Sequence, residues 1–220
     1  MLLAIDTSTR QIGVALYDGQ RILTESTWTS PFHHTAELAP AVGRALARTG
    51  IGFPELSAIG AAVGPGSFTA LRSGLAFAKG LSLAHGTPLI GIPSLDITAA
   101  GHPPSDLPLI ALLEAGRKRL AAGHYAWTES GWQSAGALDL VTIEDLAAGL
   151  TGPAVLCGEL TADALTLLAG HPFARPAPPA ANVRRPGILA LLAWERFSAG
   201  ERDDPAELAP IYLSTAGIDG

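Results

Sequence analysis

The opening of this chain is repeated, in pattern, at the start of its second half. The segment LIALLEAGRKRLAAGHY at 109–125 aligns with MLLAIDTSTRQIGVALY at 1–17 at a constant offset of 108 residues. Apolar runs coincide, and Glu114 falls on Asp6. Both segments have the pattern of a strand, an acidic and polar turn, and a second strand. The match predicts an ancient duplication and therefore two related lobes.

Local patterns in the first half predict a three-strand meander followed by alternating strands and helices. Asp18-Gly19 is a hairpin signal between two runs of strand composition. After residue 34 the apolar spacing changes to the period of a helix. Strand–helix–strand order predicts parallel strands with right-handed crossovers. The expected elements are strands at 2–6, 11–19, 20–28, 56–64 and 88–94, and helices at 35–49, at 67–84 and just after Ser94.

A Pro-rich polar stretch, AAGHPPSDLP at 99–108, marks the expected boundary between the lobes. We predict an N-terminal lobe at 1–100 and a smaller, degenerate C-terminal lobe at 101–220. RPAPPAANVRRPG at 175–187 has the composition of a connector without regular structure. The fold class is α/β, with two lobes of mixed sheets flanked by helices. Further elements are expected at 109–125, 143–150, 153–158, 160–169 and 186–199.

Charge and composition point toward a protein partner. Charged residues make up only 15% and hydrophobic residues 48% of the chain, so a partner interface is expected. The net charge of −6 disfavours autonomous nucleic-acid binding. The basic runs Arg117-Lys118-Arg119 and Arg184-Arg185 have the character of solvated loop charges, with tRNA contact as the alternative.

Cysteine and histidine usage argues against disulfides, metal sites and peptidase chemistry. The single cysteine, Cys157, lies in the apolar run AVLCG and is expected to be a buried, inert thiol of a reducing cytoplasm. The N-terminal residues have strand character, so neither a signal peptide nor a membrane span is expected. No pair of histidines has zinc-protease spacing. The six histidines are His33, His34, His85, His102, His124 and His171.

The duplicated strand–turn–strand units resemble the ASKHA superfamily, which has a duplicated actin-like, RNase H-like fold. In active members two such turns grip the phosphates of a Mg-bound nucleotide. The first turn, from Asp6 to Thr9, offers hydroxyls and a carboxylate of that kind; the alternative is that Asp6 only forms the turn. The second turn, from Glu114 to Arg117, lacks a hydroxyl, and Glu159 follows the late glycine, so this clamp is incomplete.

The segment AAVGPGSFTALRSGLAFAKG at 61–80 joins a strand to a helix through a glycine-rich elbow. A helix beginning there points free backbone N–H groups outward, as a phosphate cradle does. Within the helix, Ala70, Gly74 and Ala78 repeat every four residues and form a face of minimal side chains. Gly74 costs up to about 1 kcal/mol relative to alanine, so it needs a reason. Either another backbone approaches this face or the face packs on the chain's own sheet.

Four motifs carry a more specific resemblance. LAIDTST, GPGSFTALRSGLAFAKGL, GIPSLD and APIYLS are similar to the TsaB (YeaZ) family, the bacterial partner of TsaD in forming threonylcarbamoyladenosine (t6A) in tRNA. The similarity is dense over 1–100 and thin afterwards. Ala70 stands where that family usually has glycine, and Glu114-Ala115-Gly116 departs from its usual Asp-Ala-Arg.

The resemblance implies a non-catalytic scaffold subunit. TsaD carries the transferase chemistry for position 37 of tRNA, TsaE joins as an ATPase, and TsaB-like chains form homodimers through the same surface when alone. Contact with tRNA would be indirect, and ATP or ADP with Mg²⁺ would be shared with partner subunits. An ASKHA kinase or ATPase is the alternative function. Expected partner-binding residues are Leu38, Val42, Leu46, Ala70, Leu71, Gly74, Leu75 and Ala78; expected nucleotide-binding residues are Asp6, Thr7, Ser8, Gly64, Gly66 and Ser67.

Overall fold

The computed structural model describes residues 1–30, 34–116 and 118–213, which belong to two compact units. The first unit contains Met1–Ile97 and Arg184–Ile211, and the second is built around Thr98–Val183. This division differs from the expected boundary at residue 100. Residues 184–211 were expected in the second lobe, but they return to the first unit because their helix packs on the first sheet.

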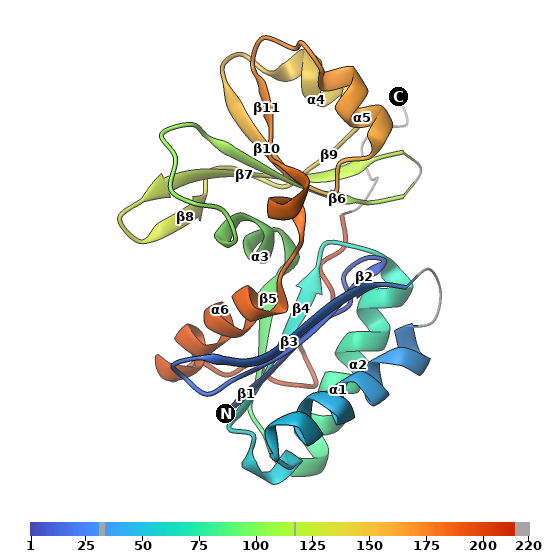
Figure 1. Ribbon diagram of the computed structural model, residues 1–220, viewed down its shortest axis with the longest axis vertical. Helices are drawn as coiled ribbons and strands as arrows, with labels where there is room; N and C mark the ends of the chain where they lie inside the picture. Colours follow the sequence, from blue (N-terminus) through green and yellow to red (C-terminus); the bar gives the residue numbers. More distant parts are fainter. Residues whose placement is uncertain (31–33, 117, 214–220) are drawn as a thin grey trace. The chain divides into compact units, whose positions relative to one another are not determined.

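The first sheet has the strand order β3-β2-β1-β4-β5 (Figure 1). The first three strands are antiparallel neighbours, which confirms the predicted meander, while β4 pairs parallel with both β1 and β5. Because parallel strands need a crossover, a helical segment precedes each of the last two strands. The strands are β1 (Leu2–Asp6), β2 (Gln11–Tyr17), β3 (Ile22–Thr29), β4 (Ala58–Gly64) and β5 (Leu89–Pro93).

Helices cover both faces of this sheet, so its central strands are apolar throughout. Side chains alternate along β1: Leu3 and Ile5 join the core beneath α1 and α2, while Leu2 and Ala4 join the core beneath α6. Figure 1 shows α1 and α2 on one side of the sheet and α6 on the other. The helices are α1 (His34–Thr49), α2 (Phe68–His85), α3 (Ser94–Ala100) and α6 (Pro186–Ser198), with a short 3₁₀ turn, η1 (Phe53–Glu55).

The second unit repeats the strand order of the first. Its path β11-β10-β6-β7-β8 corresponds to β5-β4-β1-β2-β3, and the parallel and antiparallel pairings also correspond. The duplication predicted from the 108-residue offset is therefore confirmed at the level of topology. The elements are β6 (Leu109–Glu114), β7 (Leu120–Thr128), β8 (Gly131–Ser134), β9 (Asp139–Val141), α4 (Ile143–Gly149), β10 (Ala154–Gly158), α5 (Ala162–Leu168), β11 (Ala174–Pro176) and η2 (Pro179–Asn182).

The Pro-rich segment at 175–187 is more regular than its composition indicated. It holds most of β11, the whole of η2 and the start of α6. Proline has no backbone N–H to donate to a ladder, but β11 is the last strand of its sheet, and an edge position tolerates Pro176. The expectation of a connector without structure is therefore wrong.

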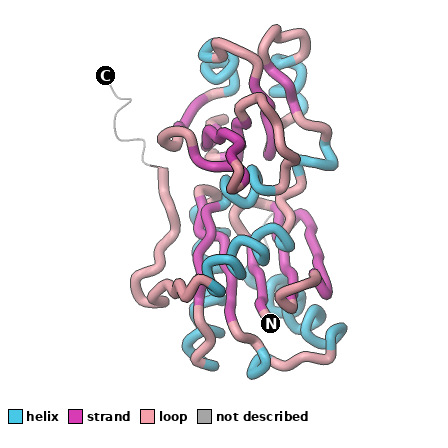
Figure 2. Tube along the Cα trace, turned by 90° about the vertical axis from the view of Figure 1, so that its left-hand side faces the viewer, coloured by secondary structure: helices cyan, strands magenta, loops and turns pink. Residues whose placement is uncertain are grey.

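After α6 the chain runs as a loop along the edge of β5 (Figure 2). The Asp203 backbone N–H donates to the Leu89 carbonyl at 2.9 Å, and the Asp203 carboxylate accepts from the Gly91 N–H at 2.7 Å. Further along, the Ile211 N–H donates to the Val63 carbonyl at 2.7 Å. We call residues 201–211 the C-terminal strap. Among the helices of the described residues, none combines the length and hydrophobicity that a bilayer crossing requires.

Cys157 is the next-to-last residue of β10 and is fully buried, as expected from its apolar surroundings. Burial raises the pKa of its thiol from an ordinary 9.0 to about 12. The folded protein therefore holds this proton more tightly than the unfolded chain. The resulting stabilisation is present below pH 9 and is lost as the pH rises toward the folded pKa.

We predict that this thiol does not react with a disulfide reagent in the native protein at pH 8. Reaction should appear only on unfolding in urea, since attack requires an exposed thiolate. A free thiol such as glutathione supplies the reference rate. Labelling of the native protein at a rate close to that reference would contradict the prediction.

Candidate functional site

The six expected nucleotide-binding residues lie in the first unit, five of them near one another at the carboxyl end of β1. Asp6 is the last residue of β1, and Thr7 and Ser8 form the turn into β2. The elbow after β4 supplies Gly66 and Ser67, whose backbone meets this turn. Gly64 reaches the cluster through Ser94, as described below. The topology explains this meeting, because β1 and β4 are adjacent and parallel and end at the same edge of the sheet.

Both carboxylate oxygens of Asp6 are engaged within the chain. Oδ1 accepts from the Ser8 backbone N–H at 2.8 Å and from the Ser8 hydroxyl at 2.7 Å. This is the Asx-turn geometry that sequence reasoning held open as the alternative role for Asp6. Oδ2 accepts from Nε of Arg184 at 2.5 Å. The two side chains of this ion pair are only 2% and 1% exposed.

Ser94, the first residue of α3, ties the turn to the elbow. Its hydroxyl lies 2.5 Å from that of Ser8 and accepts from the Gly64 N–H at 3.1 Å. Ser94 was expected only as the start of a short helix. Its position after β5 corresponds to the third strand end at this edge of the sheet. Three consecutive parallel strand ends therefore share one hydrogen-bond network.

The elbow packs directly on the turn. The Ser67 N–H donates to the Ser8 carbonyl at 2.7 Å. A Cβ at Gly66 would collide with that carbonyl oxygen and would lie 2.9 Å from its carbon. Glycine is therefore required at 66 by the chain's own backbone. Ser67 occupies the N-cap position of α2, but its side chain makes no capping hydrogen bond.

The small-residue face of α2 has an internal explanation. The Thr7 hydroxyl donates to the Ala70 carbonyl at 2.8 Å, and a Cβ at Gly74 would collide with that hydroxyl and lie 3.0 Å from the Thr7 Cβ. Ala78 is fully buried in the same core. The face formed by Ala70, Gly74 and Ala78 is thus closed by this chain, and Gly74 is explained by Thr7 rather than by a partner's backbone.

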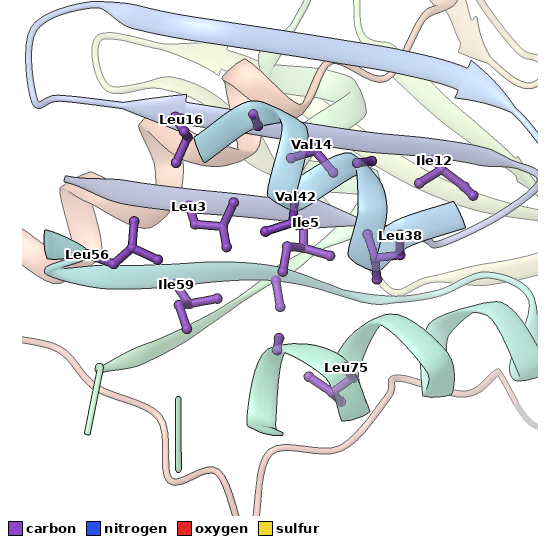
Figure 3. Close-up of a cluster of buried hydrophobic side chains, with 14 of the residues drawn as sticks. Leu3, Ile5, Ile12, Val14, Leu16, Leu38, Val42, Leu56, Ile59 and Leu75 are labelled. Carbon is purple, nitrogen blue, oxygen red and sulfur yellow. The ribbon is translucent and has the colours of Figure 1, made fainter. Parts of the chain in front are cut away.

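The remaining expected partner-binding residues are also core residues. Leu38, Val42 and Leu46 of α1 are between 0% and 5% exposed, and Leu71 and Leu75 of α2 are 0% and 4% exposed. Figure 3 shows Leu38, Val42 and Leu75 together with β-strand residues of this core. Their burial corrects the assignment of these side chains to an open surface. They fix the helices onto the sheet instead.

Arg184, like Ser94, is a site residue that sequence reasoning missed. It was interpreted as half of a solvated Arg-Arg pair, and only Arg185 fits that description, with a 58% exposed side chain paired to Glu25. Nη2 of Arg184 also donates to the Thr9 hydroxyl at 3.1 Å, and its backbone N–H donates to the Gln11 side chain at 3.1 Å. The one available signal is its position just before an apolar helix that begins with proline.

The second turn differs from the first in exposure and chemistry. Glu114 ends β6 and is exposed, and its backbone N–H donates to the Glu159 carboxylate at 3.0 Å. A negative charge therefore lies where a phosphate-binding turn would offer an N–H group. Gly158, with φ +97, packs closely on the Leu112 carbonyl. Arg117 lies outside the described residues, as does His33.

The turn network does not fit a Mg-bound nucleotide. The carboxylate that would bind metal-coordinated water is already neutralised by a buried guanidinium, and the hydroxyls of Thr7 and Ser8 are directed to groups of the chain. Separating a buried ion pair costs about 3–5 kcal/mol. Among the described residues, no group of three His, Cys, Asp or Glu side chains could hold a metal ion.

Comparison of the sequence with known proteins gives relatives whose names agree with one another. The family model described as "TsaD: tRNA N6-adenosine threonylcarbamoyltransferase" matches residues 29–173. The tRNA threonylcarbamoyladenosine biosynthesis protein TsaB of Escherichia coli is 35% identical over 100 residues, which cover 46% of this chain and 43% of that protein. In this match the chain spans less than half the length of its curated relative.

Comparison of the structure supports the predicted fold. YeaZ from Pseudomonas aeruginosa has a TM-score of 0.77 at 24% identity, covering 96% of this chain and 99% of that one. The activator of the 2-hydroxyisocaproyl-CoA dehydratase from Clostridium difficile, solved with bound ADPNP, has a TM-score of 0.55 at 10% identity, with 96% and 99% covered. The fold is therefore the duplicated, actin-like α/β fold of ASKHA proteins.

Within that class, the chain belongs to the family described as TsaD: tRNA N6-adenosine threonylcarbamoyltransferase, whose model covers well over half of its 220 residues. The resemblance to TsaB (YeaZ) inferred from its motifs is confirmed by relatives that carry those names.

Two alanine substitutions in α2 test which of its glycines faces the core and which faces outward. Gly74→Ala should lower the free energy of unfolding by about 1–3 kcal/mol, because the new methyl group must displace Thr7. Gly80→Ala is the matched control: its Cβ would meet nothing within 4 Å, and alanine should stabilise the helix by about 0.5–1 kcal/mol. Urea titration of both variants measures the difference. Equal effects would contradict the assigned orientation of α2.

Proposed function

We propose that this chain is a non-catalytic scaffold subunit in the formation of t6A in tRNA, and that it docks a TsaD-like transferase on the outward faces of α1 and α2. The function is carried over from the names of its relatives. The observation that supports the docking face is the distribution of small residues on the outside of these two helices.

Both helices have an outward row of minimal side chains. On α1 the exposed row is Ala39, Gly43 and Ala47, and on α2 it is Ala76, Gly80 and Ala84, each at four-residue spacing. A Cβ at Gly43 or at Gly80 would meet nothing within 4 Å. Glycine inside a helix is unfavourable by about 1 kcal/mol, and none of the residues that the structure describes packs closely on these two. Close approach of another protein's helices explains both.

Apolar and cationic groups accompany the row on α2. Leu83 is 74% exposed and Phe68 is 52% exposed, and the Arg72 guanidinium lies 4.3 Å from the centre of the Phe68 ring. Exposed aromatic and aliphatic side chains beside flat helix faces are suited to burial against a protein. Since α1 and α2 pack against each other on one face of the sheet, a partner with two helices of its own could complete a four-helix interface.

The same face serves a homodimer in the absence of the transferase, and a TsaE-like ATPase joins through the transferase complex. Catalysis belongs to the TsaD-like subunit. In support of this division, the first turn is engaged with its own chain and the second carries a carboxylate at its backbone N–H. Any contact with tRNA is indirect on this proposal, as the net charge of −6 favours.

The sharpest test places a large side chain in the outward row of α2 without changing the core. Gly80→Leu fills open space in the monomer and improves helix propensity, so the fold should be retained. Affinity for the organism's TsaD-like protein should fall by roughly tenfold or more. Leu83→Glu should also lower this affinity. Co-purification with calorimetry measures binding, and a t6A assay with and without this chain measures the consequence. Leu75→Glu is unsuitable, because it would bury a carboxylate in the core.

Gly149→Leu is the matched control. Gly149 is also an exposed helical glycine with nothing within 4 Å of its Cβ position, but it belongs to α4 in the second unit. This variant should bind the TsaD-like protein as the unmodified chain does. Wild-type binding by both Gly80→Leu and Leu83→Glu would overturn the docking face, and unchanged t6A formation without this chain would overturn the function.

A further inference from the structure

We infer that the Arg184 guanidinium occupies the position beside Asp6 that a cation would take, and that it makes the first turn a permanent structural clasp that excludes Mg–nucleotide. This goes beyond the scaffold function, because it concerns the role of the first turn itself. The clasp consists of Asp6, Ser8, Thr9 and Arg184.

The charge balance of the turn is the first argument. Arginine is permanently protonated, and its fork can engage several oxygens at once. Here Nε bonds the Asp6 carboxylate and Nη2 bonds the Thr9 hydroxyl. The pair is almost completely removed from solvent. A divalent cation at Asp6 would therefore have to lie beside a buried positive charge or expel it, and both are unfavourable.

The direction of the hydroxyl groups is the second argument. A phosphate-binding turn keeps its hydroxyls and N–H groups for phosphate oxygens. In this turn the Thr7 hydroxyl donates to the Ala70 carbonyl, the Ser8 hydroxyl to Asp6, and the elbow N–H of Ser67 to the Ser8 carbonyl. The groups that would recognise phosphate instead hold the turn, the elbow and α2 together.

The place of Arg184 in the chain gives the clasp its function. Arg184 is the first residue of the segment that returns to the first unit, and α6 begins two residues later. Its backbone N–H bonds the Gln11 side chain, so main chain and side chain are both anchored at the turn. Leu189, Ala190 and Ala193 of α6 then cover the second face of the sheet. The clasp thus fixes the point from which α6 starts.

Neighbouring arginines provide a matched comparison. Arg184→Met removes the buried cation, whereas Arg185→Met removes a solvated one that pairs with Glu25. The apparent melting temperature should fall by roughly 6–20 °C for Arg184→Met and by roughly 0–4 °C for Arg185→Met. In the double variant Asp6→Asn with Arg184→Met, the loss should be smaller than the sum of the two single losses.

If Arg184→Met does not fold, Arg184→Lys extends the comparison. Lysine keeps the charge but not the fork that bonds both Asp6 and Thr9, so the melting temperature of Arg184→Lys should lie below that of the wild type, and an unchanged value would count against the clasp. Insolubility of Arg184→Met beside a soluble Arg185→Met also counts as the expected loss. Equal melting temperatures for Arg184→Met and Arg185→Met would overturn the inference.

Mg-ATP is the second probe, with the full chain in calorimetry and thermal melting. The wild type should show no saturable heat and no rise in melting temperature with Mg-ATP. Saturable binding that Asp6→Asn abolishes would overturn the clasp. That result would leave the docking face of α1 and α2 intact, because capture of the TsaD-like protein is measured separately with the Gly80→Leu variant.

Discussion

The approach of α2 to the β1–β2 turn is the contact on which the first unit depends. Two glycines permit it: Gly66 lies against the Ser8 backbone, and Gly74 lies against the Thr7 side chain. With α2 held at this distance, its leucines reach the core that α1 also covers. The outward faces of both helices are then set by what is buried beneath them. The proposed docking face is therefore positioned by the same turn that holds the strand ends together.

The two halves show how one topology can diverge in chemistry. Strand order and pairing are shared, and Gly64 at the end of β4 and Gly158 at the end of the corresponding strand β10 both have a positive φ. Yet the first turn is buried and paired with arginine, while the second is exposed and offers two carboxylates. Backbone pairing depends on the apolar pattern of the strands, whereas the turns depend on a few side chains. A duplicated fold can therefore be conserved while its ligand chemistry changes.

Local patterns predicted most of the elements, since hydrophobic periodicity and turn signals act over a few residues. The helix expected at 67–84 is α2 (Phe68–His85), and the one expected at 186–199 is α6. Periodicity did not reveal which face of α2 is buried, because Ala70-Gly74-Ala78 and Ala76-Gly80-Ala84 have the same spacing. Nor could it reveal the partner of Asp6, since Arg184 is 178 positions away and the pairing leaves no local signal. The type of each element was thus predictable, while the buried face of a helix and the pairing of residues far apart in the sequence were not.

The C-terminal strap covers the exposed edge of β5. Gly91 has its N–H bonded by the Asp203 carboxylate and its carbonyl bonded by Arg196 at 2.6 Å, so side chains occupy main-chain groups that an incoming strand would use. Leu208 packs so closely on Gly91 that a methyl group there would collide with it. Lateral growth of the sheet is consequently blocked at this end. Self-association through β5 is thereby disfavoured.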